Sequence, residues 1–157
     1  MVITLEVFHS SYRDFKEISL EKAKDFRDFG KGFYVTEYMT DSLAILKKLN
    51  GFLYTYQLNI TDDLNILTFE TDADWFDYVL KNRLEKIEDN YDIVIGKTAS
   101  GKCAKLFKKI RYQNKEFSKK YLQDTILTND YKEQICIKTA KGLEALKLVN
   151  KNYIEFQ

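Results

Sequence analysis

The chain has 157 residues, of which 45% are hydrophobic and 15% aromatic, and this is enough apolar material for the core of one domain. Its 25 basic and 24 acidic residues leave a net charge of +1, a balance that argues against a general binder of nucleic acid or membrane surfaces. Two distant cysteines, Cys103 and Cys136, and a single histidine do not fit the spacing of a zinc site. We therefore expect no metal, and both thiols reduced in a cytoplasmic protein.

The N-terminal part of the chain is predicted to contain two strands and two helices. The first run is rich in β-branched and apolar residues, and Glu6 interrupts it, so we expect a strand rather than a signal peptide. Thr40 is expected to cap the second helix. The expected elements are a strand over residues 2–9, a short helix over residues 19–24, a strand over residues 32–36 and a helix over residues 41–49.

The strongest element of the remaining chain is a helix over residues 73–87, because its apolar side chains recur at helical spacing after the capping residue Asp72. The other expected elements are strands over residues 52–59, 91–96, 133–139 and 153–156, an extended piece over residues 66–69, helices over residues 103–112 and 118–127, and a helical turn over residues 142–148.

The order of these elements predicts an α+β fold in a single domain spanning residues 1–157. Strands and helices alternate without a regular βαβ repeat, which disfavours a doubly wound parallel sheet. The chain has no proline and only six glycines, so nothing indicates a linker between domains. No stretch approaches the ~20 apolar residues that a membrane-spanning helix needs.

Several catalytic motifs are excluded by their surroundings. Residues 28–30 read Asp-Phe-Gly, but the chain is too short for a protein kinase and lacks its catalytic loop. Residues 96–98 read Gly-Lys-Thr without the upstream glycine that a phosphate-binding P-loop requires. Phosphoryl transfer, metal-assisted hydrolysis and triad chemistry therefore lose support.

One constellation of polar and aromatic residues remains. His9 closes the first strand, and the sequence FGKGFYVT follows at residues 29–36. Ser42 stands eight residues after Tyr34, and a late strand begins at residues 133–134 with Glu-Gln.

This pattern resembles the poly-ADP-ribose polymerase and diphtheria-toxin-like branch of the ADP-ribosyltransferases, which carries a His-Tyr-Glu signature. More closely, the chain is similar to a family of small bacterial domains of unknown function grouped with that superfamily. The matching features there are the FGKGFY motif, Trp75, an Asn-Arg pair at residues 82–83, the strand at residues 91–96 and a Gln-Ile pair at residues 134–135.

The resemblance implies an ADP-ribosyltransferase-like fold, in which split antiparallel β-sheets with flanking helices surround a cleft for NAD. His9 would bind a ribose hydroxyl, and the ring of Tyr34 would lie against the nicotinamide. The backbone after His9 and the hydroxyl of Ser42 would hold the nicotinamide amide. The implied NAD-binding residues are His9, Ser10, Ser11, Phe29, Gly30, Gly32, Tyr34 and Ser42.

The third catalytic position can be assigned in two ways. One alignment of the late strand places Glu133 at the catalytic glutamate, and the other places Gln134 there. Adjacent residues of a strand face opposite ways, so only one of them can enter the cleft, and we favour Gln134. Neither Tyr131 nor Lys132, which stand two residues before these candidates, is acidic, so the pattern of arginine-modifying toxins is missing.

Three functions stay open from the sequence. The first is transfer of ADP-ribose from NAD to an unknown protein or nucleic acid, with a toxin-like role that a small antitoxin-like protein neutralises. The second is a weakly active or inactive module that binds NAD, ADP-ribose, a partner protein or RNA. The third is an RNA-binding protein that uses residues 97–120, which contain nine basic residues and one acid, and whose binding would depend steeply on salt.

Overall fold

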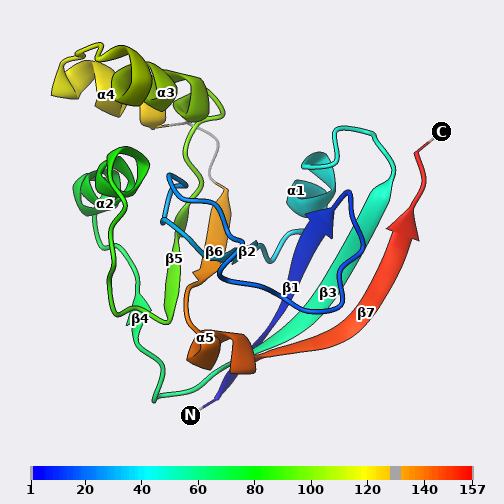
Figure 1. Cartoon of the computed structure of the whole chain (residues 1–157). Coiled ribbons are helices and arrows are strands. Elements are labelled where there is room, and N and C mark those ends of the chain that lie inside the picture. The colour runs from blue at the N-terminus through cyan, green and yellow to red at the C-terminus, as the bar shows by residue number, and fades with distance from the viewer. Residues whose placement is uncertain (1, 128–131, 157) are drawn as a thin grey trace.

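The computed structural model describes residues 2–127 and 132–156, and it has the α+β organisation that the order of elements predicts (Figure 1). The strands are β1 (Ile3–Ser11), β2 (Phe33–Val35), β3 (Gly51–Ile60), β4 (Ile66–Leu67), β5 (Ile93–Lys97), β6 (Glu133–Ile137) and β7 (Leu146–Ile154). The helices are α1 (Met39–Ala44), α2 (Asp72–Leu84), α3 (Cys103–Gln113), α4 (Lys119–Ile126) and α5 (Ala140–Glu144).

The longest strands form one antiparallel sheet in the order β1-β3-β7. His9 lies opposite Tyr54 in this sheet, close to the end of β1. A single bridge between Phe8 and Thr36 joins β1 to the chain just after β2. This bridge holds the end of β1 beside the second sheet, which is where the predicted site residues meet.

The second sheet has the order β2-β6-β5-β4, with β2 and β4 at its edges. Its pairs are antiparallel except for the short contact between β4 and β5, which is parallel. The expected pair of purely antiparallel sheets is therefore corrected at this edge. Tyr34 pairs with Cys136 in the register of β2 and β6.

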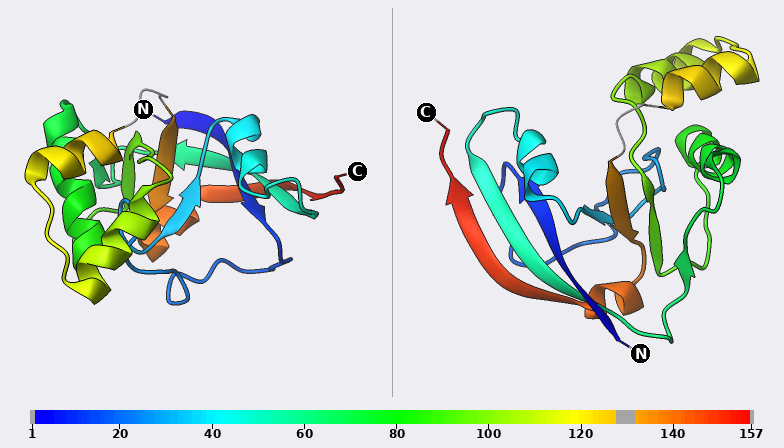
Figure 2. Two further views of the ribbon diagram at one scale, coloured as in Figure 1. Left: turned by 90° about the horizontal axis from the view of Figure 1, so that it is seen from above. Right: turned by 180° about the vertical axis from the view of Figure 1, so that it is seen from behind.

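Two apolar clusters cover the two faces of this second sheet. One cluster lies between the sheets and contains Val7 and Tyr54 from the first sheet with Phe33 and Ile135 from the second. The other cluster covers the opposite face with helices α2, α3 and α4, which lie on the far side of the molecule from β7 (Figure 2). Because β6 contributes to both clusters, its residues alternate between two buried environments.

Helix ends follow ordinary capping chemistry. The hydroxyls of Thr71, Ser118 and Thr139 accept hydrogen bonds from backbone N–H groups in the first turns of α2, α4 and α5. The predicted cap Asp72 is instead the first residue of α2, where its charge favours the helix dipole. The predicted cap Thr40 lies inside α1, which starts at Met39 without a side-chain cap.

Four predicted elements differ clearly from the structure. Residues 19–24 form turns and bends, because so short a segment with few buried side chains does not offset the cost of starting a helix. Helix α1 ends five residues earlier than expected and gives way to turns. The expected helical turn over residues 142–148 and strand over residues 153–156 are replaced by α5 and a long β7, because pairing with β3 overrides local preference.

No helix in the described parts of the chain combines the length and the apolar character that crossing a membrane requires.

Candidate functional site

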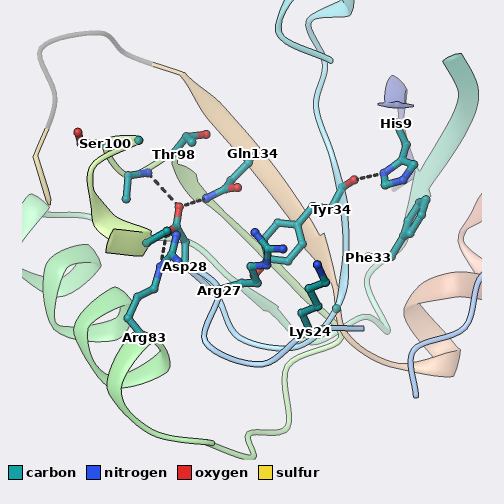
Figure 3. A pocket seen from close by; sticks show the side chains of 14 residues that line it. His9, Lys24, Arg27, Asp28, Phe33, Tyr34, Arg83, Thr98, Ser100 and Gln134 are labelled. Atoms are coloured by element: carbon teal, nitrogen blue, oxygen red, sulfur yellow. Dashed lines mark hydrogen bonds and ion pairs between the residues drawn. The ribbon is translucent and has the colours of Figure 1, made fainter. Parts of the chain in front are cut away.

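A cavity of about 480 Å³ opens between the β2–β6 part of the second sheet and the segment that leads into α3 (Figure 3). His9, Tyr34 and Gln134 all line it, although they come from three strands that are far apart in the sequence. Thr98, which follows β5, and Ala104 of α3 also line it. The fold therefore brings together three of the four residues that the sequence suggested for catalysis.

His9 is fixed by its neighbours at the edge of β2. Its Nδ1 lies 2.7 Å from the carbonyl oxygen of Tyr34, and its ring packs against Phe33 with 4.2 Å between centroids. A carbonyl can only accept, so Nδ1 donates and carries the proton. Burial lowers the pKa of His9, which keeps the ring neutral near pH 7 and leaves Nε2 as an acceptor. This contact therefore runs to the backbone of Tyr34 and not to its phenol.

The ring of Tyr34 lines the cavity, while its hydroxyl is committed to the preceding turn. The hydroxyl donates to the carbonyl oxygen of Gly30 at 2.6 Å and accepts from the backbone N–H of Phe29 at 3.0 Å. Burial raises the pKa of Tyr34 well above its usual value. The cavity is thus offered an aromatic ring rather than an acid or base (Figure 3).

The glycines of the FGKG turn are required by packing. Gly30 has a φ of +80°, and a Cβ there would come within 2.5 Å of Oδ1 of the buried Asn82. Gly32 lines the cavity, and a Cβ there would collide with Cys136. Phe29 is fully buried in the apolar core and Gly30 does not line the cavity, so the role expected for these two residues in holding NAD is corrected to one in holding Tyr34.

The alternation along β6 decides which of the two neighbouring candidates enters the cavity. Gln134 stands two residues before Cys136, the partner of Tyr34, and so shares the face on which Tyr34 lies. Glu133 belongs to the opposite face and does not line the main cavity. It lines an adjoining cavity of about 280 Å³ instead, together with Gln134. The sequence has no acid two residues before either candidate. Lys132 stands before Gln134, and Tyr131, which stands before Glu133, lies outside the described residues.

A buried network orients the side chain of Gln134. Its Nε2 donates to Oδ2 of Asp28 at 2.8 Å, and the backbone N–H of Ala99 donates to the same oxygen at 3.0 Å. Arg83 donates to Oδ1 of Asp28 through Nε at 2.9 Å and Nη2 at 2.6 Å. Because the carboxylate can only accept hydrogen bonds, the amide nitrogen of Gln134 points toward Asp28 and its amide oxygen points away from Asp28.

The predicted serines divide between two places. The hydroxyls of Ser10 and Ser42 lie 2.7 Å apart, and both residues are buried. Ser42 lines none of the cavities described here, which corrects its expected contact with a nicotinamide. Ser10 and Ser11 line a further cavity of about 670 Å³ that adjoins the main one.

Basic side chains that sequence reasoning missed stand where these two cavities meet. Lys24 and Arg27 line both of them, and in Figure 3 their side chains lie beside Tyr34. Arg27 and Lys24 come from a loop of mixed charge, which in sequence is indistinguishable from an ordinary solvated segment. The cavities together therefore pair an aromatic surface with two cations, which suits a ligand that carries both rings and phosphates.

Neither thiol is set up as a nucleophile. Burial raises the pKa of Cys103 and of Cys136 to about 12, so both remain protonated at neutral pH. Within the described residues, no group of three or more His, Cys, Asp or Glu side chains could hold a metal ion.

Comparison with known proteins places the chain in a family. Residues 5–148 match the model of a family described as a protein of unknown function, DUF3990. The chain belongs to the DUF3990 family. None of the curated proteins matches it, and none of the solved structures does. The description of the DUF3990 family assigns no activity to its members.

Proposed function

We propose that this DUF3990 protein is an NAD-dependent ADP-ribosyltransferase that modifies a macromolecule. The observation that carries the proposal is the convergence of His9, Tyr34 and Gln134, from β1, β2 and β6, on one cavity. His9 and Tyr34 are the positions at which the sequence resembles the His-Tyr-Glu branch of that superfamily, and Gln134 is the position favoured for the third member. The ADP-ribosyltransferase-like fold is part of the same proposal.

The chemistry of each side chain suits NAD. The Nε2 of a neutral His9 accepts a hydrogen bond from a ribose hydroxyl, and the half-buried ring of Tyr34, which lines the cavity, stacks on the nicotinamide. Lys24 and Arg27 lie where the pyrophosphate would cross from the main cavity to its neighbour.

The reaction needs little acid–base assistance. The bond between the ribose C1′ and the nicotinamide nitrogen breaks, and its electron pair leaves with a neutral nicotinamide. The remaining ribose develops positive charge, which the amide dipole of Gln134 stabilises through its oxygen. The acceptor then bonds to C1′ and releases its proton to solvent. An uncharged amide contributes less than a carboxylate, so we expect turnover slower than in relatives with glutamate.

Incubation with labelled NAD and a cell lysate tests the proposal. Wild-type protein should transfer label to a macromolecule, His9→Ala and Tyr34→Ala should lose most of that transfer, and Tyr34→Phe should keep it because the ring is retained. Ser42→Ala is the matched control, since its hydroxyl is buried against Ser10 outside the cavity. Equal labelling by wild type, His9→Ala and Tyr34→Ala would remove the assignment.

One observation favours a second function, a catalytically inactive module that binds NAD or ADP-ribose. The third position holds Gln134, whose amide is already bonded to Asp28, where an active enzyme of this kind would place a carboxylate. Calorimetry separates the two functions: a module would bind NAD without releasing nicotinamide. Gln134→Glu is the informative variant, because a gain in nicotinamide release would indicate a site that lacks only the charge.

The biological role belongs to the same proposal. A cytoplasmic ADP-ribosyltransferase of this size would act as a toxin whose activity a small antitoxin-like protein restrains. Expression in bacteria tests this role: the wild-type protein should arrest growth, whereas His9→Ala should not, and normal growth with the wild type would contradict a toxic role.

A further inference from the structure

Helix α3 continues the rim of the main cavity along its exposed face. Ala104 lines the cavity, and Lys108 and Tyr112 follow it at intervals of four residues, so the three side chains form one row along the helix. Lys105 and Lys109 flank this row. The buried side chains of α3 lie on the opposite side of the helix, against the apolar core.

The surface formed by α3 and α4, residues 102–124, is strongly basic. Its acids, Glu116 and Asp124, are both exposed, and its basic side chains outnumber them fourfold. Of the basic side chains on this surface, only Lys119 forms an ion pair with a described residue, and its Nζ lies 3.7 Å from Oδ1 of Asp77. The whole chain has a net charge of only +1, so the excess is concentrated on this surface. The two helices lie side by side at the end of the molecule away from β7 (Figures 1 and 2).

Aromatic rings stand among these charges. Tyr112 is 72% exposed and Tyr121 is 50% exposed. Tyr121 stacks on Phe117, with 5.1 Å between ring centroids and 15° between planes, so its ring is held in place. Cations that follow a phosphate backbone, together with aromatic faces on which bases stack, are the features of surfaces that bind single-stranded nucleic acid.

We propose that the surface of α3 and α4 binds a single-stranded polynucleotide and directs it into the main cavity as the acceptor of ADP-ribose. Binding itself needs only the described surface, whereas the acceptor role rests on the proposed function. In the transfer step a nucleophilic nitrogen or oxygen of the strand bonds to the ribose C1′ of NAD, the electron pair of the broken bond leaves with nicotinamide, and the nucleophile gives its proton to water. An acidic protein would use the charges but not the two exposed rings.

Binding is tested by fluorescence anisotropy with labelled 20-nucleotide RNA and DNA of one sequence. Each phosphate contact on a single strand contributes about −0.7 to the slope of log K against log salt. Lys105→Glu with Lys108→Glu should therefore weaken binding by at least about tenfold and reduce the steepness of that slope by about 1.4. Lys16→Glu with Lys147→Glu is the matched control, because it makes the same change in net charge at exposed residues elsewhere.

The aromatic contribution has its own variants. Tyr112→Ala should weaken binding by at least about fivefold, while Tyr112→Phe should bind as the wild type does, because stacking needs the ring alone. Unfolding curves of every variant should coincide with the wild type, since these side chains are exposed. Equal loss of affinity in the Lys16 and Lys147 control, or tighter binding of poly-glutamate than of RNA at the same salt, would overturn the proposal. The comparison of RNA with DNA shows which sugar the surface prefers.

The acceptor role is tested separately with labelled NAD and the bound strand. Label should enter the strand with wild-type protein and be reduced at least tenfold by the Lys105 and Lys108 variant, while NAD binding to that variant stays unchanged. If the wild type binds NAD and the strand but no label enters it, the acceptor role alone is wrong. If the wild type does not bind NAD, the proposed function and the acceptor role are both wrong, and the binding surface is judged by the anisotropy result.

Discussion

At the scale of single residues, the site is held by contacts that the ligand itself would not use. The backbone carbonyl of Tyr34 fixes the imidazole of His9, and the turn at Gly30 takes the hydroxyl of Tyr34. As a result, His9 offers the cavity an unprotonated ring nitrogen, and Tyr34 offers it an aromatic face. A ligand would therefore meet positioned groups without the cost of ordering them.

The half-buried His9 makes stability depend on pH in one direction. Its pKa is lowered in the folded state from a usual value of 6.5, so the unfolded chain binds the proton more readily. The stabilisation is fully present above about pH 6.5 and is lost as the pH falls through the folded pKa. We expect the free energy of unfolding, measured with urea, to decrease between pH 7.5 and pH 5 in the wild type.

The matched control for this pH dependence is His9→Gln, which keeps a hydrogen-bond donor toward the carbonyl of Tyr34 and does not titrate. This residue is the only histidine of the chain, so the decrease over that pH range should largely disappear in the variant. An unchanged pH dependence would show that the imidazole is not buried in its neutral form.

At the scale of elements, the pair of Asp28 and Arg83 joins four separate parts of the chain. Asp28 lies in the loop before β2, Arg83 is in the last turn of α2, and the carboxylate also holds the backbone at Ala99 and the side chain of Gln134 on β6. Arg83 further donates to the carbonyl oxygen of Phe26 at 3.0 Å. The network therefore sets the distance between the sheet and the segment that leads into α3.

Breaking the ion pair of Asp28 and Arg83 should lower the free energy of unfolding far more than breaking an exposed ion pair. The side chains of Asp28 and Arg83 are only 6% and 13% exposed, so Asp28→Ala leaves a buried guanidinium without its partner. We expect a loss of about 3–5 kcal/mol in the free energy of unfolding, measured with urea. The control is Asp77→Ala, whose partner Lys119 is 3.7 Å away at the surface, and its loss should stay below about 1 kcal/mol.

A double variant separates the effect of an unpaired buried charge on stability from the effect of Asp28 on the position of Gln134. Asp28→Leu combined with Arg83→Met removes both charges and should recover much of the stability lost in Asp28→Ala. The double variant should still bind NAD more weakly than the wild type, because Gln134 loses the acceptor that orients it. Full recovery of NAD affinity would show that Asp28 does not position Gln134.

The elements differ in how far the sequence could predict them. Helix α2 follows from apolar residues at helical spacing, and strands β5 and β6 follow from short continuous apolar runs, since both of their faces are buried. Only the end of strand β7 was predicted, by the expected strand over residues 153–156, because most residues of β7 are exposed and its pairing with β3 makes it a strand. In the site, His9 and Tyr34 were found by resemblance, whereas Asp28 was missed because its partners are distant in the sequence.

At the scale of the whole molecule, β6 couples the two apolar clusters. Ile135 packs between the two sheets and Cys136 packs against the helices, and the two residues are neighbours on one strand. Neither cluster can lose its packing without disturbing the backbone that supports the other. The candidate site lies on this shared element, so its geometry depends on both clusters.

Unfolding should accordingly be a single cooperative transition. Trp75 is the only tryptophan and lies in the helical cluster, so its fluorescence reports on that half, while far-ultraviolet circular dichroism reports on the whole backbone. We expect urea curves from both probes to coincide. Val7→Ala in the cluster between the sheets and Val79→Ala in the helical cluster should each move both curves together, by about 1–3 kcal/mol. Separate midpoints, or a shift of fluorescence alone in Val79→Ala, would show that the sheets and the helices unfold as independent units.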